Sequence, residues 1–292
     1  MKFTKMHGLG NDYIYVDCMD GSMGGDDSTL LTDDNRLAEL SCKLSDRHTG
    51  IGGDGIIMIL PSDIADFKMR IFNADGSEGK MCGNGSRCVG KYVYDKGLTD
   101  KTDIALETLS GVKYLHLSLG EDGKVSGATV DMGEPVLTPA LIPVTVAEGE
   151  GNIDIPFLID GKEVSLTAVS MGNPHGVVFV DSLDDVDVHG VGPLLETHPA
   201  FPDRANIEFV EVLAPGEVRM RVWERGSGET MACGTGACAT AVATVITGRS
   251  GGAREITVHL LGGDLKINYD EASGHVFMQG PATEVFSGEV AI

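Results

Sequence analysis

Two stretches of the sequence share one pattern and decide the fold. The first reads FNADGSE over residues 72–78 and continues as CGNG over 82–85. The second reads WERGSGE over 223–229 and continues as CGTG over 233–236, and counterparts differ by 151 in number (82 and 233, 85 and 236). Each copy is typical of a strand with an aromatic residue near its end, a loop rich in Gly and Ser, and a helix that begins at Cys-Gly-x-Gly. The repeat predicts two similar α/β domains related by a pseudo-twofold axis.

Strand-like segments dominate the rest of the chain, and helices are few. Apolar residues at helical spacing predict helices over 33–46, 82–95 and 233–247, and a weaker one over 188–198. The predicted strands are 3–7, 13–17, 56–60, 67–72, 104–106, 112–119, 125–131, 163–169, 177–180, 207–212, 218–223, 256–260, 264–268, 276–279 and 284–290. The first two strands flank a Gly-Leu-Gly-Asn turn and are expected to form a hairpin. Gly133-Glu134-Pro135 breaks the pattern and is predicted to be the linker between the domains.

The composition is that of an acidic globular protein. The chain has 292 residues, of which 42% are apolar and 23% charged, a balance that argues against disorder. It carries 44 Asp and Glu against 22 Lys and Arg, which gives a formal net charge of −22. Nucleic acids and anionic membranes are bound through cationic surfaces, so neither is expected as a partner. The 40 glycines gather in clusters such as 48–55, which indicates tight turns or close approach of the backbone.

Targeting features and cysteine usage predict a cytoplasmic protein. Residues 1–8 include basic residues but no apolar segment of the kind found in signal peptides. The most apolar helical stretch, 236–246, is too short and too rich in Ala and Thr to span a bilayer. The six cysteines are even in number, yet a long chain without an export signal is expected to keep them as thiols.

The repeated Cys-Gly-x-Gly motif places a thiol at a helix N-terminus. There the first N–H groups lack partners within the helix and the helix dipole is positive. Glycine lets an anion approach this backbone closely, and the same environment is expected to favour the thiolate and lower the pKa of Cys82 and Cys233. Two such elements face to face would hold one carboxylate with a thiol on each side. That arrangement suits removal of a proton from the α-carbon and reprotonation from the opposite face.

Other interpretations of the cysteines stay open. Cys82 and Cys233 are alternatively packed core thiols, or they form a regulatory disulfide in a thiol redox sensor. The spacing of the cysteines lacks the paired Cys-x2-Cys of zinc sites, so no metal is expected. The GxGxxG pattern at 50–55 follows a helix and precedes a strand, the reverse of the order in dinucleotide-binding sites. The cysteines interpreted as core or incidental thiols are Cys18, Cys42, Cys88 and Cys238.

Five segments carry a resemblance to a known family. They read MHGLGNDY over 6–13, FNADGSE over 72–78, CGNGSRC over 82–88, MGNPH over 171–175 and ERGSGETMACGTG over 224–236. In this order, and over nearly the whole chain, they resemble the diaminopimelate epimerases. The resemblance implies an epimerase that interconverts L,L- and meso-diaminopimelate for lysine and peptidoglycan synthesis, without a cofactor.

The resemblance also implies roles for the residues at matching positions. Cys82 and Cys233 are the implied base and acid, and His175 and Glu224 are implied to support the proton transfers. The backbone implied to hold the reacting carboxylate is that of Gly83, Asn84, Gly234 and Thr235. The residues implied to bind the rest of the substrate are Asn11, Asn73, Asn173, Asn206 and Arg225. The guanidinium of Arg225 suits a carboxylate, because it donates two parallel hydrogen bonds.

The fold implied by the resemblance is two domains, each a mostly antiparallel or mixed sheet wrapped around a central helix. The implied domains are residues 1–130 with 282–292, which contain Cys82, and residues 131–281, which contain Cys233. A homodimer is implied as well. Where some family members have Gly-Phe-Asp-Gln, this chain has GGDG at 52–55, so no Gln side chain is available there. The acidic insert at 21–28 is expected to be a surface loop.

A proline or hydroxyproline racemase is the alternative enzyme, since it resembles the same two-thiol arrangement with another pocket. A small ring substrate would not require Arg225 and several Asn residues for a distal amino-acid end, so diaminopimelate is favoured. A related branch of isomerases has a carboxylate base in place of the first cysteine, and Cys82 argues against it. A redox sensor, from a different class of protein, would exchange no α-proton in any amino acid.

Overall fold

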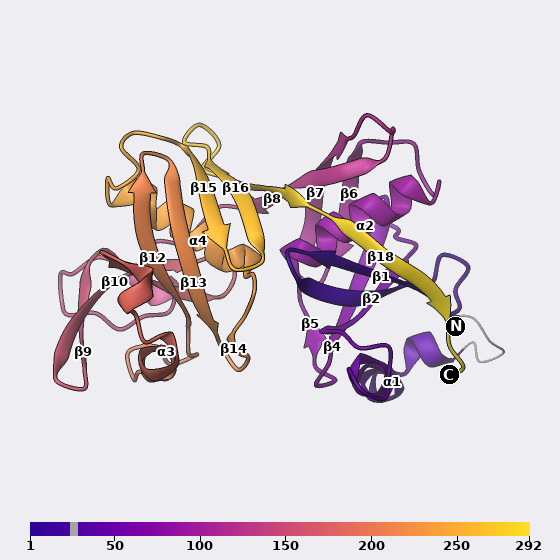
Figure 1. Cartoon of the computed structure of the whole chain (residues 1–292), viewed down its shortest axis with the longest axis horizontal. Helices are drawn as coiled ribbons and strands as arrows, with labels where there is room; N and C mark the ends of the chain where they lie inside the picture. Colours follow the sequence, from indigo (N-terminus) through magenta and orange to yellow (C-terminus); the bar gives the residue numbers. More distant parts are fainter. Residues whose placement is uncertain (24–28) are drawn as a thin grey trace. The chain divides into compact units, whose positions relative to one another are not determined.

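The chain folds into two compact units, described by a computed structural model for residues 1–23 and 29–292 (Figure 1). Unit 1 consists of Met1–Val130 and Gly280–Ile292, and unit 2 consists of Asp131–Gln279. Most of the insert predicted to be a surface loop, residues 24–28, lies outside the described residues.

Unit 1 opens with a hairpin and closes with the last strand of the chain. Its elements are β1 (Lys2–Gly8), β2 (Asn11–Asp17), η1 (Leu30–Thr32), α1 (Asp34–Ser45), β3 (Gly55–Leu60), β4 (Phe67–Asn73), β5 (Glu78–Gly79), α2 (Gly83–Asp95), β6 (Asp103–Thr108), β7 (Gly111–Leu119), β8 (Val125–Gly133) and β18 (Thr283–Glu289). Leu9 and Gly10 join β1 to β2, and both have a positive φ, which is typical of the tight turns in two-residue hairpins. β18 pairs antiparallel with β1, so the C-terminal strand lies in the sheet of this unit.

Unit 2 repeats this series of elements. They are η2 (Pro139–Leu141), β9 (Ile155–Ile159), β10 (Lys162–Ser170), β11 (Pro174–Val180), η3 (Leu183–Asp185), α3 (Val188–Glu196), β12 (Asn206–Ala214), β13 (Glu217–Glu224), β14 (Gly228–Glu229), α4 (Gly234–Ile246), β15 (Glu255–Leu260), β16 (Gly263–Tyr269) and β17 (Val276–Pro281). Met171 and Gly172 lie between β10 and β11, where Leu9 and Gly10 lie between β1 and β2.

The strands of the two units pair in the same order. In unit 1, β2 is parallel to β3, β3 is antiparallel to β4, and β4 is parallel to β6. In unit 2, β11 is parallel to β12, β12 is antiparallel to β13, and β13 is parallel to β15. The registers agree as well, since Ile56 pairs with Phe72 and Ile207 pairs with Trp223. The structure confirms the predicted fold class, a mixed α/β protein with two similar units.

One largely buried helix packs against the sheet of each unit (Figure 1). α2 packs against β1, β2 and β7, whereas α4 packs against β10 to β13, β15 and β16. The segment of α4 from Gly236 to Thr244 contains mostly Ala, Thr and Val, and these small side chains allow the helix to be enclosed by strands. Each buried helix begins with its Cys-Gly-x-Gly motif, so the sheet positions the motif.

The predicted elements agree with the structure, except that the strands β5, β9 and β14 escaped prediction and the linker was misplaced. The four predicted helices are confirmed as α1, α2, α3 and α4. β9 escaped prediction, because Pro156 interrupts its Ile-Pro-Phe-Leu-Ile sequence and proline normally argues against a strand. The predicted linker at 133–135 is wrong, because β8 continues to Gly133 and unit 2 begins within that strand at Asp131. Each helix of the described residues is too short or too polar to cross a lipid bilayer.

Candidate active site

Cys82 and Cys233 occupy the same position in their units, as the N-cap residues of α2 and α4. Each Sγ accepts a hydrogen bond of 3.3 Å from the backbone N–H three residues later, in Gly85 and Gly236 respectively. The first N–H groups of an α-helix have no carbonyl partner within it. The residues that present such groups beside the two thiols are Gly83, Asn84, Gly234 and Thr235. Each helix start therefore combines a thiol with N–H donors at the positive end of a helix dipole.

The third helical residue of each motif is glycine, and a side chain there would displace a side chain of the strand beneath the helix start. A Cβ atom on Gly85 would lie 2.7 Å from Cδ1 of Ile57. A Cβ atom on Gly236 would lie 2.6 Å from Oε1 of Glu208. Both distances are shorter than close packing permits. The two copies of the motif thus rest on different chemistry, an alkyl group in unit 1 and a carboxylate in unit 2.

Neutral amides surround the thiol of unit 1. Oδ1 of Asn11 accepts a hydrogen bond of 3.4 Å from Sγ of Cys82, and Asn11 is the first residue of β2, directly after the hairpin turn. Oδ1 of Asn73, at the end of β4, accepts a hydrogen bond of 3.3 Å from the hydroxyl of Tyr13. The buried side chain of Asn84 accepts one of 3.0 Å from Arg87, so this residue offers its backbone to a ligand.

A charged network holds Asn11 in place. Nδ2 of Asn11 donates to Oδ2 of Asp54 at 3.0 Å, which turns Oδ1 of the amide toward the thiol. Arg47 bridges Asp54 and Asp12 at 3.0 and 2.7 Å, and Lys5 pairs with Asp12. Burial raises the pKa of Asp54. Burial acts on the pKa of Asp12 in the same direction, but hydrogen bonds from Arg47 and Lys5 outweigh it and lower that pKa.

Ionisable groups surround the thiol of unit 2. His175 and Glu208 are both fully buried, and Nδ1 of the ring lies 2.7 Å from Oε1 of the carboxylate. Nε2 of the same ring lies 3.1 Å from Oδ1 of Asn173. Glu224, at the end of β13, accepts a hydrogen bond from the hydroxyl of Thr230. These side chains come from β11, β12 and β13, whose pairing lays them side by side beneath the start of α4.

The environment of Cys233 raises the pKa of its thiol well above the ordinary value. Burial is the largest cause, and the negative charges of Glu224 and Glu208 act in the same direction. Contacts with Thr235 and with the N–H of Gly236 lower this pKa but do not offset the other effects. The sequence-based expectation of a lowered pKa at the helix N-terminus is therefore wrong for Cys233. Burial raises the pKa of Glu224 as well.

Arg225 lies in the loop between β13 and β14, and its backbone is held in place by two side chains. Oδ1 of Asn206 accepts a hydrogen bond of 2.8 Å from the N–H of Arg225. Glu196, at the end of α3, accepts hydrogen bonds from the N–H of Gly226 at 3.0 Å and from Nε1 of Trp223 at 2.8 Å. The guanidinium itself donates to one backbone carbonyl, that of residue 203, at 2.8 Å. The backbone of this loop is therefore held in place, and it carries the cationic side chain of Arg225.

The structure groups the predicted site residues by unit. In unit 1, Asn11 contacts Cys82 directly, whereas Asn73 and Asn84 make hydrogen bonds to other side chains. In unit 2, Asn173 and His175 form one cluster with Glu208, and His175 and Cys233 lie close enough to Glu224 to act on its pKa. Asn206 and Arg225 form a second group, joined by a hydrogen bond.

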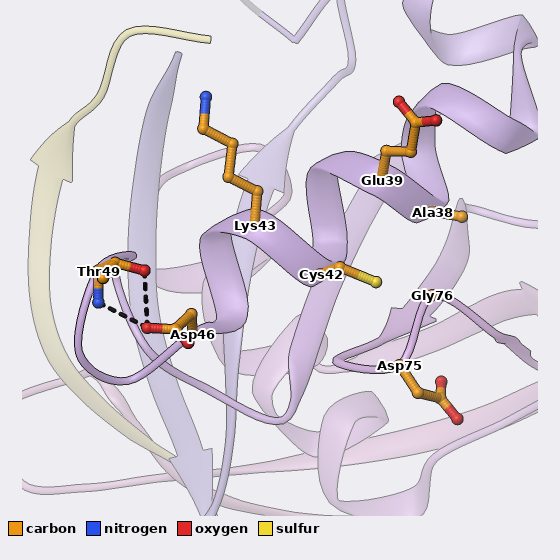
Figure 2. A pocket seen from close by; sticks show the side chains of 8 residues that line it. All are labelled: Ala38, Glu39, Cys42, Lys43, Asp46, Thr49, Asp75 and Gly76. Carbon is orange, nitrogen blue, oxygen red and sulfur yellow. Dashed lines mark hydrogen bonds between the residues drawn. The ribbon is translucent and has the colours of Figure 1, made fainter.

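A surface pocket of about 590 Å³ lies beside α1 in unit 1 and is separate from these groups (Figure 2). Figure 2 shows Cys42 pointing toward the loop after β4, while Lys43 points to another side of the helix. The residues that line the pocket are Ala38, Glu39, Cys42, Lys43, Asp46, Thr49, Asp75 and Gly76. None of them is a predicted site residue. Cys42 is exposed, in contrast to the buried Cys18, Cys88 and Cys238.

Sequence reasoning missed three carboxylates that support the site. Asp54 holds Asn11, Glu196 holds the loop of Arg225, and Glu208 holds His175. The signal for Glu208 was present, because it is a single charge inside the apolar strand Ile-Glu-Phe-Val. Asp54 and Glu196 carried no comparable signal, since acidic residues in loops and near helix ends are common on protein surfaces.

The sequence is similar to proteins of one family over both units. The family model described as diaminopimelate epimerase matches residues 3–138 and 167–285. The diaminopimelate epimerase of Agathobacter rectalis is 55% identical, with 100% of each chain covered. The protein of the same name from Acetivibrio thermocellus is 54% identical over 99% of this chain and 98% of its own. That of Methanococcus maripaludis is 52% identical over 100% of each chain.

Solved structures with low sequence identity share the fold. A phenazine biosynthesis protein of the PhzF family from Bacillus anthracis aligns with a TM-score of 0.72 at 18% identity, over 100% of this chain and 99% of that one. A hydroxyproline epimerase from Agrobacterium vitis, with bound trans-4-hydroxy-L-proline, aligns with a TM-score of 0.68 at 16% identity, over 99% and 90%. A probable proline racemase from Agrobacterium radiobacter, with bound carbonate, also has a TM-score of 0.68 at 16% identity, over 100% and 93%.

Proposed function

The chain belongs to the diaminopimelate epimerase family, and on that premise we propose that it interconverts L,L- and meso-diaminopimelate. This reaction inverts one α-carbon, so a base must act on one face and an acid on the other. We assign these roles to Cys82 and Cys233, with no cofactor. The observation that carries the proposal is that each of two repeated units has a cysteine as the N-cap of its buried helix. The product serves lysine and peptidoglycan precursor synthesis.

In the proposed reaction, the thiolate of Cys82 removes the α-proton and the thiol of Cys233 supplies one to the opposite face. The Cα–H bond breaks, and its electron pair delocalises into the carboxylate of a planar intermediate. A new Cα–H bond forms as the S–H bond of Cys233 breaks. The raised pKa of Cys233 supports its role as the acid when Cys82 is the base. In the reverse reaction the two cysteines exchange these roles. The proposal requires both thiols to reach the same α-carbon.

Backbone N–H groups stabilise the charge that develops on the reacting carboxylate. The donors are those of Gly83, Asn84, Gly234 and Thr235, each at the positive end of a helix dipole. Such preorganised donors gain strength as negative charge grows during the reaction. Glu224 and His175 are assigned to the reacting ammonium group and the adjacent thiol, because a buried carboxylate complements a cation.

The distal amino-acid end of the substrate is assigned to a cation and several amides. The guanidinium of Arg225 suits the distal carboxylate through paired hydrogen bonds. The fixed backbone of its loop supports this role, because a preordered cation loses little entropy on binding. The amides assigned to this end and to the α-carbon region are Asn11, Asn73, Asn173 and Asn206.

The cellular setting and assembly are part of the same proposal. The mechanism needs reduced thiols, which the cytoplasm maintains, so we assign the enzyme to that compartment. We also propose a homodimer formed through β18, where Val285 and Phe286 are exposed next to each other. Exposed apolar side chains on a strand are suited to burial against a second chain. Light scattering of the wild-type protein and of Phe286→Asp would test this assignment, which expects a loss of dimer in the variant.

Proton NMR of the reduced protein with L,L-diaminopimelate in D2O tests the activity. Loss of the α-proton signal together with formation of the meso isomer, without added pyridoxal phosphate, is the expected result. Exchange in proline or hydroxyproline alone would move the assignment to the racemases, whose fold this chain shares. No exchange in any of these amino acids, with both thiols shown to be reduced, would overturn the proposal and favour a redox sensor.

A further inference from the structure

Glu208 stands out because it is a carboxylate in a position that the repeat fills with an apolar side chain. It is the third residue of β12, and its counterpart in β3 is Ile57. Both side chains are fully buried. A charge in such a place is unfavourable unless polar partners compensate for lost hydration. Unit 1 has an alkyl group at this position and unit 2 has a carboxylate. We therefore expect the carboxylate to serve a function that only unit 2 requires.

The carboxylate of Glu208 lies next to the side chain of His175 and the start of α4. Oε1 lies 2.7 Å from Nδ1 of His175, and the β11–β12 register puts the two residues on the same face of the sheet. Oε2 is buried and, within the part of the chain that the structure describes, has no hydrogen-bond partner. A carboxylate used only to fix the fold would be expected to satisfy both oxygens. Among the described residues, one oxygen of Glu208 is thus left without a polar partner in the interior.

The missing side chain of Gly236 brings this carboxylate close to the sulfur. The position of a Cβ on Gly236 lies 2.6 Å from Oε1 of Glu208 and 3.2 Å from Sγ of Cys233. Both atoms therefore border the same small space under the first turn of α4. In unit 1 the corresponding space over Gly85 is bordered by Sγ of Cys82 and by the apolar Cδ1 of Ile57. Only the thiol of unit 2 has a carboxylate at this place.

We propose that Glu208 is a positioning residue that keeps Cys233 protonated before turnover. It acts through a fixed negative charge beside the sulfur and through its hydrogen bond to His175, which sets the orientation and tautomer of the ring. The interpretation of Cys233 as the acid rests on the proposed epimerase function, but the protonation of the thiol does not. The other ionisable groups that face Cys233 are Glu224 from β13 and His175 from β11.

Alkylation of the thiols as a function of pH tests the proposal without any substrate. Iodoacetamide reacts with thiolates, so the pH midpoint of the reaction reports protonation, whereas accessibility changes only the limiting rate. Cleavage after Lys and Arg separates the two cysteines into peptides 81–87 and 226–249. Fragmentation of the second peptide distinguishes Cys233 from Cys238. In the wild type, Cys233 is expected to have a higher midpoint than Cys82, and the reverse order would overturn the proposal even if no variant folds.

Glu208→Gln removes the charge but keeps the shape and an acceptor for His175. We expect alkylation of Cys233 at neutral pH to become about tenfold faster, equivalent to about one pH unit in the midpoint, while the midpoint of Cys82 stays unchanged. Glu211→Gln is the matched control, because it makes the same change in the same strand, three residues away and paired with Arg219. Glu208→Asp keeps the charge and is expected to restore the high midpoint. An unchanged midpoint in folded Glu208→Gln would overturn the proposal.

Kinetics with diaminopimelate then separate positioning from a purely structural role. Glu208→Gln is expected to lower kcat about tenfold with little change in KM, and to shift the pH profile to lower pH in the direction that uses Cys233 as the acid. A loss of activity with an unshifted pH profile would indicate a structural role and overturn the proposal. Absence of activity in the wild type would contradict the proposed function, yet the alkylation midpoints would still decide the role of Glu208.

Discussion

The two units present a cysteine at the same helix position and surround it with different chemistry. In unit 1 the thiol of Cys82 donates a hydrogen bond to the neutral amide of Asn11, and the side chain beneath the helix start is Ile57. In unit 2 burial, together with the charges of Glu224 and the buried Glu208, raises the pKa of Cys233. Three pairs of corresponding positions account for the contrast, namely Tyr13 and His175, Ile57 and Glu208, and Asn73 and Glu224.

This difference teaches how a repeated fold supports a reaction that needs unlike partners. The common strand pairing and the common helix N-cap fix where each sulfur lies. The residues beneath the helix start raise the pKa of the sulfur in unit 2, whereas Ile57 and Asn73 place no carboxylate at the corresponding positions of unit 1. In the proposed mechanism, the repeat supplies the geometry, and the residues that differ between the units distinguish the base from the acid. Each prediction below changes one side of this comparison.

Removal of either thiol is expected to have the largest effect. Cys82→Ala and Cys233→Ala should each lower epimerisation by about 10³-fold or more, because each removes a proton-transfer group that the other cannot replace. The α-proton signal in D2O and the ratio of isomers measure the loss. Cys42→Ala is the matched control, since this exposed thiol belongs to the separate pocket beside α1, and it should retain full activity. Substantial epimerisation by either single variant would contradict the two-base mechanism.

Loss of the Arg225 guanidinium is expected to have the second-largest effect on activity. Arg225→Met should reduce kcat/KM for diaminopimelate by about 10²-fold, because a paired, charge-assisted contact to the distal carboxylate is lost. Most of the effect should appear in KM, as expected for a group remote from the reacting carbon. Arg219→Met provides the control, since Arg219 pairs with Asp184 and Glu211 on the surface. Equal effects of the two substitutions would remove Arg225 from the substrate site.

The charged network of unit 1 is expected to have a smaller influence. Asp54→Asn removes the carboxylate that accepts from Nδ2 of Asn11, so the amide beside Cys82 should lose its fixed orientation. We expect kcat to fall about tenfold with the alkylation midpoint of Cys233 unchanged, because the effect is confined to the other unit. Asp34→Asn, at an exposed partner of Arg70, serves as the control. A shift of the Cys233 midpoint in Asp54→Asn would show that the two environments are not independent.

The sequence predicted the architecture well because its strongest signals are local. Each copy of the repeated motif, the helical spacing and the hairpin at Gly10 can be recognised from neighbouring residues. Most of the elements were found in this way, whereas β9 was missed because Pro156 argues against a strand. The electrostatics were not predictable in the same way. The pKa of Cys233 is raised first by burial and then by the charges of Glu224 and Glu208, which strand pairing and the packing of α4 bring near the thiol.

The smallest expected effects concern the pH dependence of stability. Asp12 in unit 1 and Glu224 in unit 2 are expected to change the free energy of unfolding with opposite dependence on pH. The folded-state pKa of Asp12 is lowered, so its contribution is present above its unfolded pKa near 3.8 and is lost as the pH falls through the folded pKa. The folded-state pKa of Glu224 is raised, so its contribution is largest below about 4.5 and is lost as the pH rises through the folded pKa. Asp12→Asn should therefore destabilise the protein at pH 7 by about 1 kcal/mol or less, and hardly at all at pH 3.

Glu224→Gln should show the reverse trend, with a more favourable effect on stability at pH 7 than at pH 4, because it removes a buried charge only where the carboxyl is ionised. Urea unfolding followed by circular dichroism at several pH values measures both variants against the wild type. Asp46→Asn is a useful reference, because its lowered pKa arises from hydrogen bonds at the surface of unit 1. If Asp12→Asn and Glu224→Gln changed the urea midpoint with the same slope against pH, the two carboxyls would not differ in environment. The difference between the two thiols would then have to come from burial of Cys233 and from Glu208.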